Sequence, residues 1–131
     1  MPAVELRFPP RAGHVRTARL VAVAAARRSG LDDVRLDELR VAVGEACTRA
    51  LHRCEAAGAT DPVLLTIDDT GHGLTVEVTD LCGSPRGAGR DEPPPAEDPI
   101  VVALLQGLAD AVEVLDGPCG PGGLVRLEWW R

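Results

Sequence analysis

Three common residue types are missing from this sequence of 131 residues, which contains no lysine, no asparagine and no tyrosine. All 14 of its Lys and Arg positions are therefore arginines, and one Phe and two Trp complete a small aromatic set. Codons for the three missing residues are rich in A and T, so their absence indicates a genome of high GC content, such as that of an actinobacterium. This bias carries no information on function by itself.

A membrane-spanning run is also missing. Uncharged stretches within the helical patterns, such as residues 20–26, fall far short of the ~20 apolar residues that span a bilayer. The N-terminus lacks the charged, apolar and small-residue order of a cleavable leader. We expect one soluble, cytoplasmic domain over residues 1–131, which at this length buries roughly two-thirds of the surface of its unfolded chain.

Metal-binding motifs are absent as well. The three histidines have neither the H-x-x-x-H nor the H-E-x-x-H spacing, and the cysteines form no C-x-x-C pair. Since free cysteine behaves as a small hydrophobic residue, we expect buried free thiols at Cys47, Cys54, Cys82 and Cys119. No metal site is predicted.

Charge is divided unevenly along the chain. Residues 1–60 carry ten Arg and seven acids, about +3, whereas residues 61–131 carry four Arg and thirteen acids, about −9. With few aromatic residues and no basic run beyond Arg27-Arg28, the sequence gives little support to nucleic-acid binding. An acidic or mixed-charge protein partner is the better expectation.

Hydrophobic periodicity predicts alternating strands and helices. Period-two runs indicate strands, and apolar residues every three or four positions indicate helices that end at Gly or begin at Asp. The expected strands are 3–8, 62–68, 74–80, 112–115 and 124–130, and the expected helices are 14–28, 33–57 and 100–111. This order predicts an α+β, two-layer sandwich with helices on one face of a mixed, mostly antiparallel sheet. A flexible Gly/Pro-rich, lid-like segment is expected at about 82–99.

Three residues in this frame have the chemistry of a site. Glu45 and Arg49 are four residues apart on the second helix, which favours an ion pair. Gly44 lies beside them in mid-helix, where glycine costs ~1 kcal/mol relative to Ala. This cost suggests close packing against another backbone or a ligand. Asp80 ends a strand ahead of a Gly turn, a position that also suits an Asx turn.

The text of residues 14–52, with Gly44-Glu45-Ala46 at its centre, resembles bacterial anti-sigma factors of the serine-protein-kinase type. These proteins belong to the histidine-kinase-like (GHKL) ATPase superfamily, and the resemblance runs from about Leu6 to Trp129. It implies a Bergerat-type sandwich that acts in partner switching. It also implies a homodimer that binds a sigma factor, an anti-anti-sigma (STAS-domain) protein, or both.

Carried onto this sequence, the family's nucleotide motifs match unevenly. Glu45 corresponds to the acidic residue that orients the attacking group, and Asp80 to the residue that reads adenine. Arg49 takes the place of the magnesium-binding Asn, and it offers five donors and no acceptor. Gly83 stands one place from the expected first glycine, where Cys82 is found. Residues Pro99 and Val101 occupy the positions of the two lid glycines.

The resemblance thus implies ATP or ADP as ligand at Arg49, Asp80 and Gly83, without a magnesium ligand at Arg49. The favoured interpretation is an anti-sigma regulatory protein with a degraded ATP site. The alternative is an active ATP-dependent serine kinase that phosphorylates the anti-anti-sigma protein, with Glu45 as its catalytic residue. The run "RGAGR" (residues 86–90) is read either as a phosphate loop or as solvated linker.

Partner binding is expected on the first helix, where Arg19 falls on an Arg found in relatives of the family. Arg16 lies three residues earlier on the same helix. The alternative is that both arginines simply lie on a solvent-exposed face of the helix and bind no partner. Trp129 and Trp130 alternate in the last strand, so one should point inward and one outward.

Overall fold

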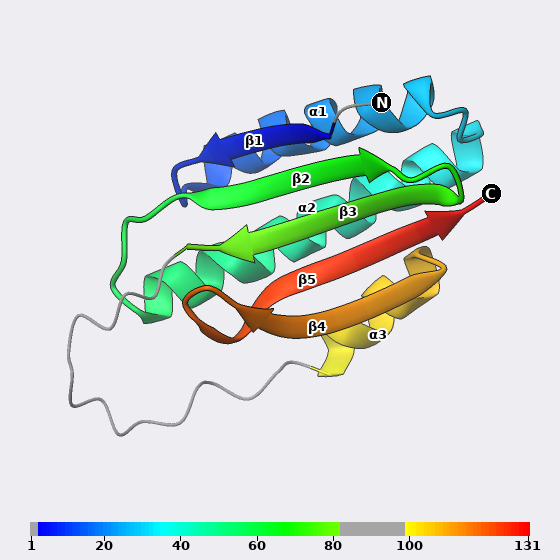
Figure 1. The fold of residues 1–131 in the computed structure, drawn as a ribbon. Helices are drawn as coiled ribbons and strands as arrows, with labels where there is room; N and C mark the ends of the chain where they lie inside the picture. The colour runs from blue at the N-terminus through cyan, green and yellow to red at the C-terminus, as the bar shows by residue number, and fades with distance from the viewer. Residues whose placement is uncertain (1–2, 82–98) are drawn as a thin grey trace.

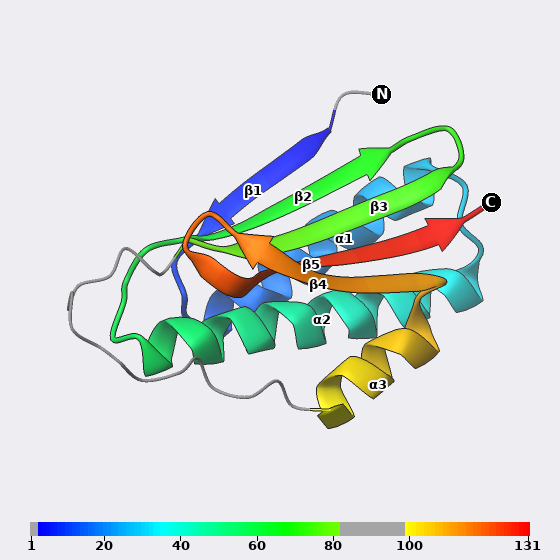
Figure 2. The ribbon, with the colours of Figure 1, turned by 60° about the horizontal axis from the view of Figure 1, so that its bottom comes forward.

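The computed structural model describes residues 3–81 and 99–131. Five strands form one sheet in the order β1-β2-β3-β5-β4, and three α-helices cover one of its faces (Figures 1 and 2). The strands are β1 (Val4–Phe8), β2 (Val63–Asp69), β3 (Gly73–Asp80), β4 (Ala111–Gly117) and β5 (Gly120–Trp130). The helices are α1 (Val15–Arg28), α2 (Asp33–Ala56) and α3 (Pro99–Leu108), with a short 3-10 turn, η1 (Ala12–His14), before α1.

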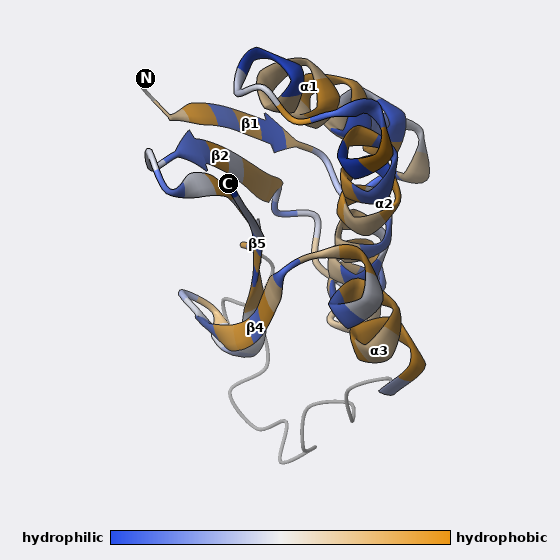
Figure 3. Ribbon diagram, turned by 90° about the vertical axis from the view of Figure 1, so that its right-hand side faces the viewer, coloured by the Kyte–Doolittle hydropathy of each residue, from blue (hydrophilic) through white to orange (hydrophobic). Residues whose placement is uncertain are grey.

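The sheet is antiparallel in all four of its pairings. The hairpin predicted from two β-rich runs is confirmed, since Val63 of β2 lies opposite Asp80 of β3. In β2 the alternation of apolar side chains buries Val63, Leu65 and Ile67, because successive side chains of a strand point to opposite faces. The apolar face of the sheet therefore meets the helices, as the two layers in Figure 3 show.

Helix α2 is the central element of the helical layer. It begins after Asp32, whose side chain accepts a hydrogen bond from the N–H of Arg35 at 2.9 Å, as an N-cap does. Near its N-terminal end the Arg35 guanidinium donates to the carboxylate of Asp110, which lies just before β4. Burial opposes ionisation of Asp110, but the N–H of Trp130 and the Arg35 charge prevail and hold its pKa below the usual range.

The two tryptophans divide between core and surface as predicted. Trp129 is 1% exposed, and its indole N–H donates to the carbonyl of Leu108 at 3.1 Å. Trp130 is 57% exposed. The buried indole joins β5 to the last turn of α3, so it fixes the helix against the sheet.

The C-terminal hairpin differs from its predicted form. Ala111 begins β4 instead of ending the third helix, and β5 already begins at Gly120. The Gly/Pro run was expected to be a turn, but Gly120 and Gly122 lie inside β5 with φ of +141° and +74°. Glycine adopts such angles without strain. The strand therefore continues through a run that reads as loop.

Of the cysteines predicted to be buried free thiols, Cys47 is free and buried, Cys119 is free but only half-buried, and Cys54 is disulfide-bonded. Cys82 lies outside the described residues. Cys47 is completely buried on α2, and burial raises the pKa of its thiol to about 12 although the Arg19 charge lowers it. The disulfide at Cys54 had no sequence signal, because pairing depends on Cα separation in the folded chain. None of the helices described is long and apolar enough to cross a membrane.

The predicted lid-like segment at about 82–99 lies outside the described residues, except that Pro99 begins α3. The expectation that residues 1–131 form a single domain stays a prediction.

Replacing Trp129 by Ala is expected to destabilise the protein by about 3–5 kcal/mol, since the change leaves a large cavity and removes the indole donor to Leu108. The neighbouring exposed residue provides a matched control: Trp130→Ala should change the free energy of unfolding by about 0.5 kcal/mol or less. Urea denaturation followed by circular dichroism measures both values. Equal losses for the two variants would contradict the division between core and surface.

Candidate functional site

Asp80, the predicted adenine-reading residue, is held by an arginine of α2. The Nε of Arg53 donates to Oδ2 of Asp80 at 2.7 Å, and the Asp80 side chain is only 3% exposed. The other end of the same guanidinium donates to the carbonyl of Pro121 in β5 at 2.8 Å. Arg53 therefore joins the C-terminal half of α2 to the end of β3 and the start of β5.

Arg49 lies one turn earlier on α2 and binds the same part of β5. Its side chain is buried, with the residue 9% exposed, and its Nη2 donates to the carbonyl of Gly122 at 2.7 Å. At Gly122 an added Cβ would lie 3.3 Å from nitrogens of both guanidinium groups, so the close approach needs glycine. We call Arg49, Arg53, Asp80 and the carbonyls of Pro121 and Gly122 the arginine clamp.

The clamp determines how the described residues fit a nucleotide and its magnesium ion. Oδ2 of the Asp80 carboxylate is already paired with the Arg53 guanidinium, so one of the two oxygens expected to read adenine is engaged inside the protein. Arg49 cannot ligate a cation because it has no acceptor atom. Within residues 3–81 and 99–131 no group of three or more His, Cys, Asp or Glu side chains could hold a metal. Arg49 does not fit a magnesium ion, while Oδ1 of Asp80 keeps acceptor capacity for a further donor.

Glu45, the predicted catalytic residue, is half-buried on α2. No salt bridge between the described residues joins it to Arg49, since Arg49 is directed to the β5 carbonyl instead. The favourable helical spacing of the two residues is therefore not used for an ion pair. The catalytic role of Glu45 stays a prediction.

The phosphate-site predictions fall mostly outside the described residues. Gly83 and the run 86–90 lie there, so the structure says nothing of either. Pro99 and Val101, at the expected lid-glycine positions, belong to the first turn of α3. Pro99 has no backbone N–H, so it cannot donate a hydrogen bond to a phosphate.

The second predicted surface lies on α1. The side chain of Arg19 packs against Gly44 of α2. An added Cβ at Gly44 would stand 3.0 Å from the Cδ of Arg19. The close packing predicted from a mid-helix glycine is thus made by an arginine side chain, and not by a backbone or a ligand within the described residues. Arg16, the other predicted partner residue, is exposed on the same helix.

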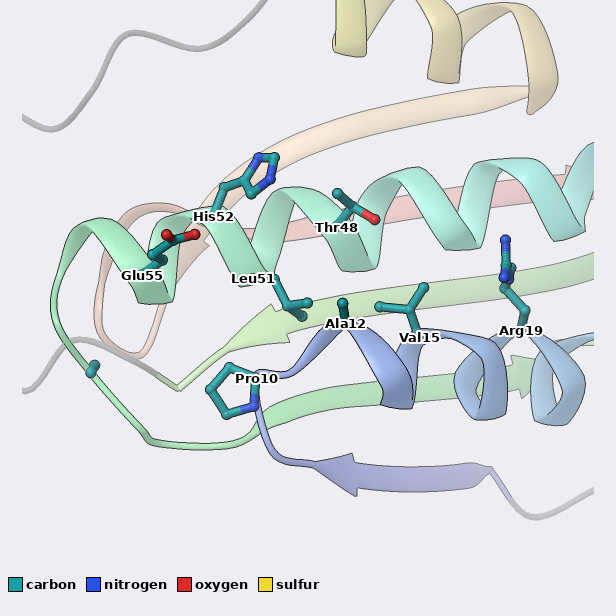
Figure 4. A pocket seen from close by; sticks show the side chains of 9 residues that line it. Pro10, Ala12, Val15, Arg19, Thr48, Leu51, His52 and Glu55 are labelled. Atoms are coloured by element: carbon teal, nitrogen blue, oxygen red, sulfur yellow. The ribbon is translucent and has the colours of Figure 1, made fainter.

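An open cavity of about 550 Å³ lies between α1 and the C-terminal half of α2 (Figure 4). Apolar side chains of Val15 and Leu51 face it, while Arg19 lies toward one end and Glu55 toward the other. The remaining lining residues are Pro10, Ala12, Thr48, His52 and Ala59. Arg16 is not among them, and its role in partner binding stays a prediction.

Sequence reasoning missed Arg53. Its position was readable, because it is four residues after Arg49 and so shares a helix face with it. The signal that could have found it is the arginine pair on one face of α2 combined with a strand-terminal Asp80. What the sequence did not contain is the distance between these groups, which depends on how α2 packs on the sheet.

Comparisons with known proteins agree with this architecture. The sequence matches the family described as a histidine kinase-like ATPase domain over residues 8–129. Among solved structures, the chain is similar to the crystal structure of the RsbU and RsbW domains of Rv1364c from Mycobacterium tuberculosis, with a TM-score of 0.70 and 13% identity. The match covers 99% of this chain and 32% of that chain, so this chain spans about a third of it. No curated protein matches the sequence.

The clamp makes a prediction for stability. Arg53→Ala should cost about 3 kcal/mol, because it leaves the Asp80 charge buried without its partner. The double variant Arg53→Ala/Asp80→Ala should be more stable than Arg53→Ala alone, since the buried charge is then gone. Arg40→Ala is the control: Arg40 pairs with Asp37 at 3.8 Å on the exposed face of α2, where such a pair contributes about 0–1 kcal/mol.

Urea unfolding of the four proteins at neutral pH measures these differences. An Arg53→Ala variant as stable as the Arg40→Ala control would show that the clamp contributes nothing to stability.

Proposed function

The chain belongs to the histidine kinase-like ATPase domain family, and we propose that it is a regulatory binding domain of the anti-sigma type. In this proposal it binds a sigma factor, an anti-anti-sigma (STAS-domain) protein, or both, in a partner-switching system. Partner binding does not depend on magnesium and ATP. Membership of the histidine kinase-like ATPase family suggests that the domain binds a nucleotide. The specific claim here is that any such binding does not require magnesium.

The observation that carries the proposal is the arginine clamp. Arg53 pairs with the one carboxylate expected to read adenine, and Arg49 stands where a metal ligand is expected. Phosphoryl transfer depends on a bridging magnesium ion and on precise positioning. In this domain Arg49 stands at the expected position of the magnesium ligand, and Arg53 pairs with the carboxylate expected to position adenine. The domain therefore keeps the fold of the family and lacks the magnesium ligand that phosphoryl transfer requires.

Charge on α1 supports a protein partner. The helix carries four arginines and no acid, and no salt bridge within the described residues involves them. These residues are Arg16, Arg19, Arg27 and Arg28. Arg19 also lines the cavity between α1 and α2. An acidic side chain on the partner would bind Arg19, while neighbouring apolar residues of the partner would contact Val15 and Leu51.

The structural neighbour supports the same assignment at the level of the fold. That neighbour is a crystal structure of RsbU and RsbW domains. At 13% identity the likeness extends to the arrangement of helices and strands only.

Kinase activity is tested by incubating the protein with purified candidate STAS-domain partners, ATP and magnesium, followed by mass spectrometry of the partner. We expect complex formation with or without nucleotide and no phosphoserine on the partner. Stoichiometric, magnesium-dependent phosphoserine would replace the proposal by the active serine kinase with Glu45 as its catalytic residue.

The α1 surface is tested by reversing one charge. Arg19→Glu should weaken capture of the partner at least tenfold, because it places a carboxylate where an acidic group binds. Arg27→Glu makes the same charge change on the same helix, eight residues away, and should leave affinity within about threefold. Surface plasmon resonance gives both affinities, and thermal melting verifies that each variant is folded.

Equal affinity in the two variants would assign Arg19 to the solvated face of α1 and contradict its role in binding.

A further inference from the structure

Among the described residues, Cys54 is the one cysteine that forms a disulfide, and it lies near the end of α2. The residue is only 1% exposed. Disulfides are rare in the reducing cytoplasm, where those that form usually sense or catalyse redox changes. The sequence predicts a cytoplasmic protein, and the fold has an apolar core shared by helices and sheet. The bond at Cys54 therefore suggests redox regulation more than structural support.

The two other cysteines in the described part of the chain are poor targets for oxidation. Burial raises the pKa of the Cys47 thiol to about 12. Burial and the nearby charges of Asp80 and Asp61 raise the pKa of the Cys119 thiol. Because the thiolate is the reactive form in oxidation and in disulfide exchange, both thiols are quiet at neutral pH. Within the described residues, a change of redox conditions therefore acts at Cys54.

The helix turn that carries Cys54 is closed by a Schellman motif. The N–H of Ala59 donates to the carbonyl of Cys54 at 2.9 Å, and the N–H of Gly58 donates to the carbonyl of Glu55 at 3.0 Å. Gly58 has a φ of +63°, the left-handed conformation that this motif uses. Residues 55–58 are all exposed, and helix ends open locally at low cost in free energy. A dithiol can therefore reach the bond without global unfolding.

The arginine clamp begins on the same turn. Arg53 precedes Cys54, and its guanidinium donates to Asp80 at 2.7 Å and to the carbonyl of Pro121 at 2.8 Å. The carbonyl of Arg53 accepts the N–H of Ala57 at 3.1 Å, as part of the helix end. Figure 1 shows this end of α2 beside the β4–β5 hairpin. The disulfide and the ion pair are thus two restraints on adjacent residues of one helical turn.

We propose that Cys54 is a redox-modification site, at which a dithiol of the thioredoxin class breaks the disulfide and so weakens the hold of Arg53 on Asp80. A thiolate of the reductant attacks the bond and forms a mixed disulfide. The second thiol of the reductant then closes its own disulfide, and two electrons and two protons have passed to the protein, which holds two thiols in place of the bond. Oxidised glutathione reverses the exchange and leaves as two molecules of reduced glutathione.

The coupling between the two restraints follows from their position. The cross-link limits motion of the last turn of α2, so Arg53 loses less conformational entropy when it binds Asp80 and Pro121. A contact that is stronger in the oxidised chain must stabilise the oxidised chain by the same factor, since such coupling is reciprocal. The disulfide therefore favours the clamp, and the clamp favours the disulfide.

Reduction changes what Asp80 can bind. When Arg53 is held less firmly, Oδ2 of Asp80 becomes available to another donor, such as an adenine amino group. ATP should then bind the reduced chain more tightly than the oxidised chain, without a requirement for magnesium. This last step rests on the proposed function, whereas the exchange at Cys54 and its coupling to Arg53 do not.

The first measurement is the redox equilibrium of the full chain in glutathione buffers that range from reducing to oxidising. Alkylation traps the thiols, and peptide mass spectrometry gives the alkylated fraction of Cys54, which should fall as the buffer becomes oxidising. Arg53→Ala should lower the equilibrium constant for forming the disulfide by about fivefold or more. Arg40→Ala, the same change on the exposed face of α2, and Cys119→Ser should each leave this constant within about twofold.

The second measurement needs no substitution. Hydrogen exchange at the amides of Ala57 and Ala59 should be faster in the reduced chain, because the helix end then lacks its cross-link. The amides of β2 should exchange equally in both states and serve as the internal control. Calorimetric titration with ATP, without magnesium, should give tighter binding after reduction. Cys54→Ser should bind ATP as the reduced chain does in both buffers.

Four results would overturn the inference: Cys54 in one form at every glutathione ratio, a redox equilibrium unchanged in folded Arg53→Ala, equal hydrogen exchange of the helix end in both states, or an ATP affinity independent of redox state. Circular dichroism verifies folding, and the hydrogen-exchange result decides the coupling if Arg53→Ala does not fold. Magnesium-dependent phosphorylation of a STAS-domain partner would contradict the proposed function instead and would leave the redox equilibrium of Cys54 as it is.

Discussion

The ion pair between Arg53 and Asp80 is the interaction on which the packing of α2, β3 and β5 at one end of this domain depends. It joins a helix to the end of a central strand, and the same guanidinium continues to the carbonyl of Pro121. Arg49 repeats the contact one turn away at Gly122. Because Asp80 is almost completely buried, its charge requires a partner inside the protein. The positions of α2, β3 and β5 at this end are therefore coupled through two arginine side chains.

The contacts of Arg49 bear on the absence of asparagine from this sequence. A chain without asparagine is explained by codon bias, and bias alone would allow any polar replacement at the expected metal ligand. Arg49 does more than occupy that position, since it is buried and bonded to the β5 backbone. The replacement has become part of the structure, which is expected if selection for magnesium binding has been lost.

The elements of the fold could be predicted because their signals are local. Alternation in β2 and β3, the Asp32 cap and the i, i+3 and i+4 stripe of α2 each depend on residues close in sequence. The β4–β5 hairpin was harder, because Gly120 and Gly122 read as turn residues, yet they lie in β5 at positive φ angles that glycine adopts without strain.

Long-range contacts in the candidate site could not be predicted in the same way. Arg53 and Asp80 are 27 residues apart, and nothing in either local pattern states that they meet. Gly44 did signal a close approach, but the group that approaches is the side chain of Arg19, not the backbone or ligand that was expected. The cavity between α1 and α2 follows from how those helices pack. Cys54 forms a disulfide although no motif announces one.

The domain thus combines a nucleotide-binding fold with an arginine clamp at the place where adenine and magnesium are expected. Isothermal titration of the purified protein with ATP, in the presence and absence of magnesium, tests this claim most directly. The account predicts no magnesium-dependent heat of binding and no change in ATP affinity when magnesium is removed. Stoichiometric ATP binding that requires magnesium would contradict it.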